Sequence, residues 1–186
     1  MKQTGTLRIT LAAMFLALGI LLPFLTANNM VLGQTLSLMH IPVLLSGFVC
    51  GWPWGLLAGF ITPLLRSVLI GMPPVFPTAL SMAFELAAYG ALAGFLYQAL
   101  RRSTLNIYLA LLISMLFGRL VWGLASFALF NIARDAYAQV IPIPFSLRFF
   151  WTAAFATPWP GILLHIAVIP PLIIALEKAR LIPIKG

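Results

Sequence analysis

Apolar segments long enough to cross a lipid bilayer follow one another through nearly the whole chain. About 20 apolar residues suffice for one helical crossing, and only 8% of the 186 residues are charged. Soluble domains use about 25% charged residues, so this chain cannot present the polar surface that a soluble protein needs. The sequence therefore predicts an all-α integral membrane protein and excludes the soluble enzyme folds.

Prolines and polar loops divide the apolar sequence into six predicted transmembrane helices within a single domain, residues 1–186. The second and third helices are short for full crossings, which favours tilted or re-entrant segments. Proline pairs favour interruptions of the last helix, and two loops are expected, at 26–39 and 134–148. The predicted helices cover residues 9–25, 41–51, 55–70, 77–100, 105–130 and 149–176.

The basic residues determine the orientation that we expect for these helices. Cytoplasmic loops of membrane proteins carry the excess of Lys and Arg. With both termini cytoplasmic, the external loops keep only two basic residues, Arg134 and Arg148. The net charge of +8 is therefore interpreted as a topology signal rather than as a nucleic-acid-binding surface. The cytoplasmic side receives Lys2, Arg8, Arg101, Arg102, Lys178, Arg180 and Lys185.

Sequence motifs for catalysis are missing. The chain has no Gly-x-x-x-x-Gly-Lys-Ser/Thr phosphate loop, no His-Glu-x-x-His zinc motif and no Gly-x-Ser-x-Gly nucleophile elbow. His40 and His165 stand far apart in the sequence. We therefore expect no enzyme activity, no cofactor and no metal site.

Three charged residues lie inside predicted helices, where a charge at the bilayer centre costs about 2.5–3.5 kcal/mol on insertion scales. Glu85 and Arg119 lie near the middle of the fourth and fifth helices, and Arg66 lies in the third. One interpretation is a structural ion pair of Glu85 with Arg66 or Arg119. The other is a solute site with a surplus positive charge. Arg66 is closer to an end and can snorkel, so Arg119 is the stronger candidate.

Polar and aromatic residues accompany these charges at helical spacing. Tyr89 shares a face with Glu85, and Trp122 shares one with Arg119. Such stripes either line a cavity or hydrogen-bond between helices. His40 is a ligand contact or an interfacial imidazole, Trp159 a lid or wall, and His165 a packing residue.

Small residues at Ala13 and Ala17 mark one face of the first helix. This spacing lets another helix approach closely. It serves either packing inside the protein or docking of another membrane subunit.

Several sequence blocks resemble the substrate-binding (S) components of energy-coupling factor (ECF) transporters, which take up vitamins in bacteria and archaea. The similarity covers nearly the whole chain and includes the six helices and the alanine pair. Its most specific blocks are His-Ile-Pro-Val at 40–43 and Gly-Met-Pro-Pro at 71–74. Others are Thr-Pro-Leu-Leu at 62–65, Phe-Glu-Leu at 84–86, Tyr-Gly at 89–90, Gly-Arg at 118–119 and Trp-Gly at 122–123.

The resemblance implies a six-helix bundle in a prokaryotic cell membrane. This bundle would bind solute, and other subunits would supply the energy for transport. A transmembrane coupling subunit and two ATPase subunits would be its partners, besides lipid, with Ala13 and Ala17 at the coupling subunit. The S component would topple in the bilayer to carry its site inward. Family binding regions correspond here to Asn28, Asn29, Glu85, Tyr89, Arg119, Trp122 and Trp159, with His40 as a further candidate.

The resemblance leaves the solute open among vitamins and their precursors. Aspartates typical of thiamine and metal sites are not visible, and the surplus arginine favours pantothenate, whose carboxylate Arg119 can pair with. Cobalamin precursors such as α-ribazole, and pyridoxine, come next. The alternative from another class is a structural membrane scaffold in which Glu85 and Arg119 form a purely structural ion pair.

Overall fold

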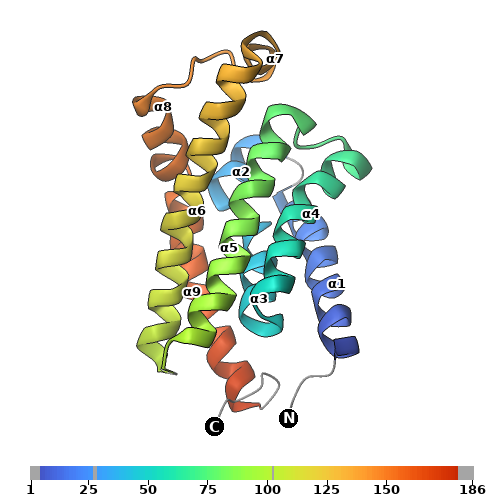
Figure 1. Ribbon diagram of the computed structural model, residues 1–186, viewed down its shortest axis with the longest axis vertical. Coiled ribbons are helices and arrows are strands. Elements are labelled where there is room, and N and C mark those ends of the chain that lie inside the picture. Colours follow the sequence, from blue (N-terminus) through green and yellow to red (C-terminus); the bar gives the residue numbers. More distant parts are fainter. Residues whose placement is uncertain (1–4, 27–28, 102, 180–186) are drawn as a thin grey trace.

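The computed structural model describes residues 5–26, 29–101 and 103–179, and long helices dominate this part of the chain (Figure 1). These helices run along one bundle, and shorter elements connect them. The long helices are α1 (Gly5–Leu21), α3 (His40–Cys50), α4 (Trp52–Ile70), α5 (Leu80–Ala99), α6 (Thr104–Ile132) and α9 (Trp159–Lys178). The short elements are η1 (Leu22–Thr26), α2 (Met30–Leu36), η2 (Val75–Ala79), α7 (Arg134–Val140), α8 (Leu147–Trp151) and η3 (Thr152–Ala156).

Six stretches of the described chain are long and apolar enough to span a membrane, which confirms the predicted helical membrane fold. Their outer faces carry large apolar side chains such as Leu124, Val68 and Phe95, as expected for surfaces in contact with lipid. The stretches are Gly5–Thr26, Val31–Cys50, Trp52–Ile70, Val75–Ala99, Thr104–Ile132 and Leu147–Lys178.

The predicted loops and breaks were wrong in three places. The predicted loop at 26–39 contains α2. Asn29 caps the N-terminus of this helix, because its side chain accepts hydrogen bonds from the amides of Val31 and Leu32 at 3.0 and 3.1 Å. The loop at 134–148 contains α7. Helix α9 continues through Pro170 and Pro171 without ending, because packing inside a membrane bundle tolerates prolines that would end a solvated helix.

The second and third spans are also longer than predicted. Helices α2 and α3 together complete the second span, Val31–Cys50. Helix α4 begins at Trp52, because Pro53 lies in its first turn, where the missing amide hydrogen is not needed. The tryptophan-proline segment at 52–54 is therefore the start of a full-length helix.

Glycines allow α3, α4 and α5 to pack with their backbones almost in contact. A Cβ atom built at Gly90 would lie 2.2 Å from the carbonyl oxygen of Gly55, and one at Gly47 would lie 2.3 Å from the carbonyl oxygen of Gly90. Helices in lipid gain little from burying apolar surface against each other, so close backbone approach is a main source of their packing energy. This three-helix contact is the closely packed part of the bundle.

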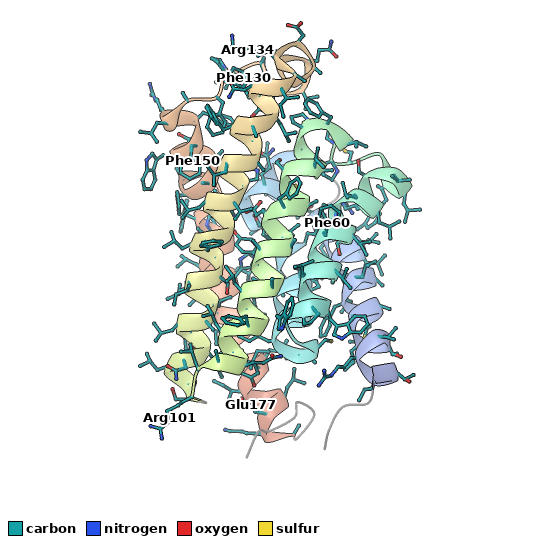
Figure 2. The ribbon with its side chains drawn as sticks, in the orientation of Figure 1. Phe60, Arg101, Phe130, Arg134, Phe150 and Glu177 are labelled. Carbon is teal, nitrogen blue, oxygen red and sulfur yellow. The ribbon has the colours of Figure 1, made fainter. Side chains whose placement is uncertain are left out.

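The first residue of α1 and the last residues of α9 lie at the same end of the bundle (Figure 1). Arg101 and Glu177 also lie at this end, whereas Arg134 lies at the opposite end beside Phe130 (Figure 2). The hydroxyl of Tyr97 donates a hydrogen bond to Glu177 Oε1 at 2.5 Å and connects α5 to α9 there. This arrangement agrees with an even number of membrane crossings.

Candidate functional site

A cavity of about 520 Å³ lies in the half of the bundle that carries α7 and α8. It reaches inward to two charged residues, one in the second turn of α5 and one near the middle of α6, and its walls are mostly apolar. The volume is in the range of pockets that enclose a small organic molecule. Besides the residues discussed below, the lining includes Pro23, Thr26, Gln34, Met39, Met72, Pro73, Thr78, Met82, Val140, Ile141, Pro142, Ile143, Phe149, Thr152, Thr157 and Pro158.

Glu85 and Arg119 form an ion pair at the inner end of this cavity. Nη1 of Arg119 lies 2.8 Å from Oε1 of Glu85. The hydroxyl of Tyr89, one turn further along α5, donates a hydrogen bond of 3.0 Å to the same carboxylate oxygen. Glu85 is only 1% exposed, so its charge is tolerated because a cation and a hydroxyl replace the lost water.

His40 extends this cluster from the first turn of α3. Its Nδ1 donates a hydrogen bond to the carbonyl oxygen of Ser37 at 3.0 Å, since a carbonyl can only accept. Its Nε2 therefore faces Glu85, with 3.6 Å between Nε2 and Oε1. The imidazole lies at the edge of the cavity rather than at the outer surface of the bundle.

His165 on α9 binds the same carbonyl. Its Nε2 donates to the oxygen of Ser37 at 3.2 Å, and its ring stacks on that of His40 with 5.9 Å between ring centres. Ser37 ends α2 in the left-handed conformation, with φ of 49°. The sequence predicts a packing role for His165, and the structure adds a specific one, which is to attach the end of α2 to α9.

Arg66 is buried and lines the cavity, so it does not snorkel to the surface as its position in the sequence had allowed. Its Nη1 donates to the carbonyl oxygen of Ile20 at 2.8 Å, and its guanidinium lies 5.3 Å from the ring centre of Phe24. Arg66 therefore connects α4 to α1 and η1. Of the two ion pairs considered for Glu85, the structure has the one with Arg119.

The structure brings most of the predicted site residues together. Asn29, His40, Glu85, Arg119 and Trp122 line the cavity. Tyr89 lies behind Glu85 and supports it, and Asn28 lies outside the described residues.

Trp159 is not among the residues that line the cavity. Its side chain is 59% exposed on α9, and the neighbouring Pro158 lines the cavity instead. Trp159 lies well inside the spanning stretch Leu147–Lys178, on the outer face of the bundle rather than in the wall of the cavity. Residues 140–143 also line the cavity, which could not be predicted, because nothing in their local sequence pattern indicates that this connection reaches it.

Ala13 and Ala17 lie on the exposed face of α1. The opposite face of the helix packs inward through Ala12, Phe15 and Gly19. The alanine pair is therefore not used for packing within the described bundle and offers a smooth strip on its outside.

Comparison with known protein families agrees with this architecture. The family model for the substrate-specific component of ECF transporters matches residues 7–173. The chain belongs to this family, which confirms the resemblance seen in its sequence blocks. Members of the family are substrate-binding subunits of membrane transporters and not enzymes. No curated protein and no solved structure matches the chain.

Proposed function

We propose that this protein binds a small vitamin or vitamin precursor in the cavity between α2, α5 and α6 and delivers it for import across a prokaryotic cell membrane. The observation that carries the proposal is the cavity of about 520 Å³ that ends on the buried Glu85–Arg119 pair. Ionisable residues inside a membrane bundle are expensive and mark solute pathways by default.

Energy for import comes, in this proposal, from a coupling subunit and two ATPase subunits. The chain itself has no phosphate loop. The exposed alanine strip on α1 supports docking of a helical membrane partner, since small side chains let helices approach closely.

Pantothenate is the first solute to test, because the described residues that line the cavity include two arginines, Arg66 and Arg119, but one carboxylate, Glu85. Cobalamin precursors such as α-ribazole, and pyridoxine, follow. The alternative function is a structural membrane scaffold, in which the Glu85–Arg119 pair would serve stability alone. A scaffold has no need of an open, mostly apolar cavity beside that pair, so the cavity favours solute binding.

Thermal unfolding of the purified protein with and without each solute tests the proposal. A solute that binds only the folded state adds RT ln(1 + [L]/Kd) to stability, or about 2.7 kcal/mol at 100 times Kd. We expect one vitamin or precursor at micromolar concentration to raise the unfolding temperature. If none of a complete vitamin panel does so, while the protein unfolds cooperatively, the scaffold function becomes the better account.

A further inference from the structure

The guanidinium of Arg119 has a donor that the surrounding protein does not use. Its Nη1 is paired with Glu85, whereas its Nε is buried and has no hydrogen-bond acceptor among the described groups. The residue is 7% exposed and lines the cavity. A buried, charged donor without an acceptor is costly. Because Arg119 is part of the cavity wall, a solute that displaces the groups covering Nε would supply the missing acceptor.

The charges around the cavity favour a negatively charged solute. Among the described lining residues, Arg66 and Arg119 are permanently charged cations and Glu85 is the carboxylate. Glu85 already accepts from Tyr89 and Arg119 through one oxygen and is almost completely buried. A cationic solute would therefore meet a carboxylate that is already neutralised, and would also meet a positive charge in excess.

The shape of the donor indicates which kind of anion fits. The side-on edge of a guanidinium, formed by Nε and Nη2, presents two parallel N–H bonds that match the two oxygens of a carboxylate. Glu85 holds the guanidinium plane from its Nη1 corner, which keeps that edge in a fixed direction. The remaining wall is mostly apolar, with Met82, Trp122 and Phe149 among its residues, and suits an uncharged body.

We propose that the solute is a monocarboxylate whose carboxylate binds the Nε edge of Arg119, and that Glu85 positions this arginine rather than contacting a solute cation. The proposal rests on the proposed function, because it names the chemical class of the solute in the same cavity. In the ion-pair interpretation both residues serve stability alone, whereas in this proposal Arg119 binds the solute and Glu85 positions Arg119.

Matched pairs of probes test the charge requirement directly. The full-length protein in lipid nanodiscs is titrated with carboxylates and with neutral analogues of the same body: pantothenate and panthenol, nicotinate and nicotinamide, biotin and biotinamide. Pyridoxine, α-ribazole and the cation thiamine complete the panel. We expect one carboxylate to bind at least about 30-fold more tightly than its neutral analogue, which corresponds to about 2 kcal/mol.

Substitution of Arg119 identifies the group responsible. For a carboxylate and its neutral analogue, Arg119→Gln should reduce the ratio of the two affinities to near one. The matched control is Arg101→Gln, at the end of the bundle away from the cavity, and it should leave this ratio unchanged. Because Arg119→Gln also removes the partner of Glu85, Arg119→Lys is measured beside it. Lysine keeps the charge for Glu85 but lacks the planar two-donor edge, so we expect its ratio to fall by about tenfold.

The outcomes separate the inference from the proposed function. Equal binding of a carboxylate and its neutral analogue, or tightest binding of thiamine, α-ribazole or pyridoxine, overturns the inference and leaves the solute-binding function intact. A ratio that is unchanged in Arg119→Lys and Arg119→Gln also overturns the inference. If neither these probes nor any member of the complete vitamin panel binds the folded protein, the proposed function fails and the inference fails with it.

Discussion

At the scale of single residues, Glu85 and Arg119 each make the burial of the other possible. Replacing Arg119 by Met leaves a buried carboxylate without its cation, which should lower the free energy of unfolding by about 3–5 kcal/mol. The double substitution Glu85→Gln with Arg119→Met removes both charges and should recover most of that loss. Thermal unfolding of the wild type, both single variants and the double variant measures the coupling. Additive effects of the two single changes would contradict a direct pair.

At the scale of elements, the end of α2 is held against α9 by two neighbouring contacts. His165 donates to the carbonyl oxygen of Ser37, and Gly161 packs so closely that an added Cβ would lie 2.7 Å from the carbonyl oxygens of Leu36 and Thr35. Since α2 contributes Gln34 and its cap Asn29 to the cavity wall, this attachment governs one side of the cavity.

His165→Phe should therefore loosen α2 while keeping an aromatic ring on α9. We expect faster hydrogen exchange at the amides of α2, and a solute dissociation rate about tenfold higher, as follows from losing about 1–1.5 kcal/mol of hydrogen bonding. His165→Gln carries an amide N–H in place of Nε2 and should restore both values in large part. Equal exchange rates in the wild type and the Phe variant would show that the Ser37 contact does not hold α2.

The close contact of α4 with α5 leads to a second prediction at the scale of elements. Gly90→Ala places a Cβ 2.2 Å from the carbonyl oxygen of Gly55, so the two backbones must separate. We expect a loss of stability at or above the upper end of the usual 1–3 kcal/mol range for overpacking, about 3 kcal/mol. Gly5→Ala is the matched control, because a Cβ there meets nothing within 4 Å. Thermal unfolding that shows equal effects for both variants would refute tight packing at Gly90.

At the scale of the whole molecule, α1 is the helix with an unused small-residue face. Ala17→Trp, or Ala13→Trp, should abolish solute uptake in cells that express the complete transporter and leave solute binding by the purified protein unchanged. The bulky ring would keep a partner helix at a distance. Leu124→Trp is the control, since Leu124 is exposed on α6, on the other side of the bundle (Figure 1). Normal uptake by the alanine variants would place the docking surface elsewhere.

Much of the architecture could be predicted from hydropathy and local spacing. The membrane class, the six spanning stretches and the candidates Glu85 and Arg119 follow from costs that act on each segment separately, namely placing charge or unpaired backbone in lipid. The ends of helices were less predictable. A loop was predicted over residues 26–39 because polar side chains such as Asn29, Gln34 and Ser37 are scattered through this stretch, although Asn29 gives α2 a good N-cap.

Only the tertiary structure decided which groups meet. Arg119 rather than Arg66 is seen to pair with Glu85, His165 reaches Ser37 across 128 positions of sequence, and Trp159 turns away from the cavity. The sequence by itself determined that a membrane helix bundle would carry buried charges, because the energy of each helix in lipid depends on its own residues. Which charges become partners and where a cavity remains depend on how the helices pack, and that packing is set by contacts between distant segments such as Gly55 with Gly90.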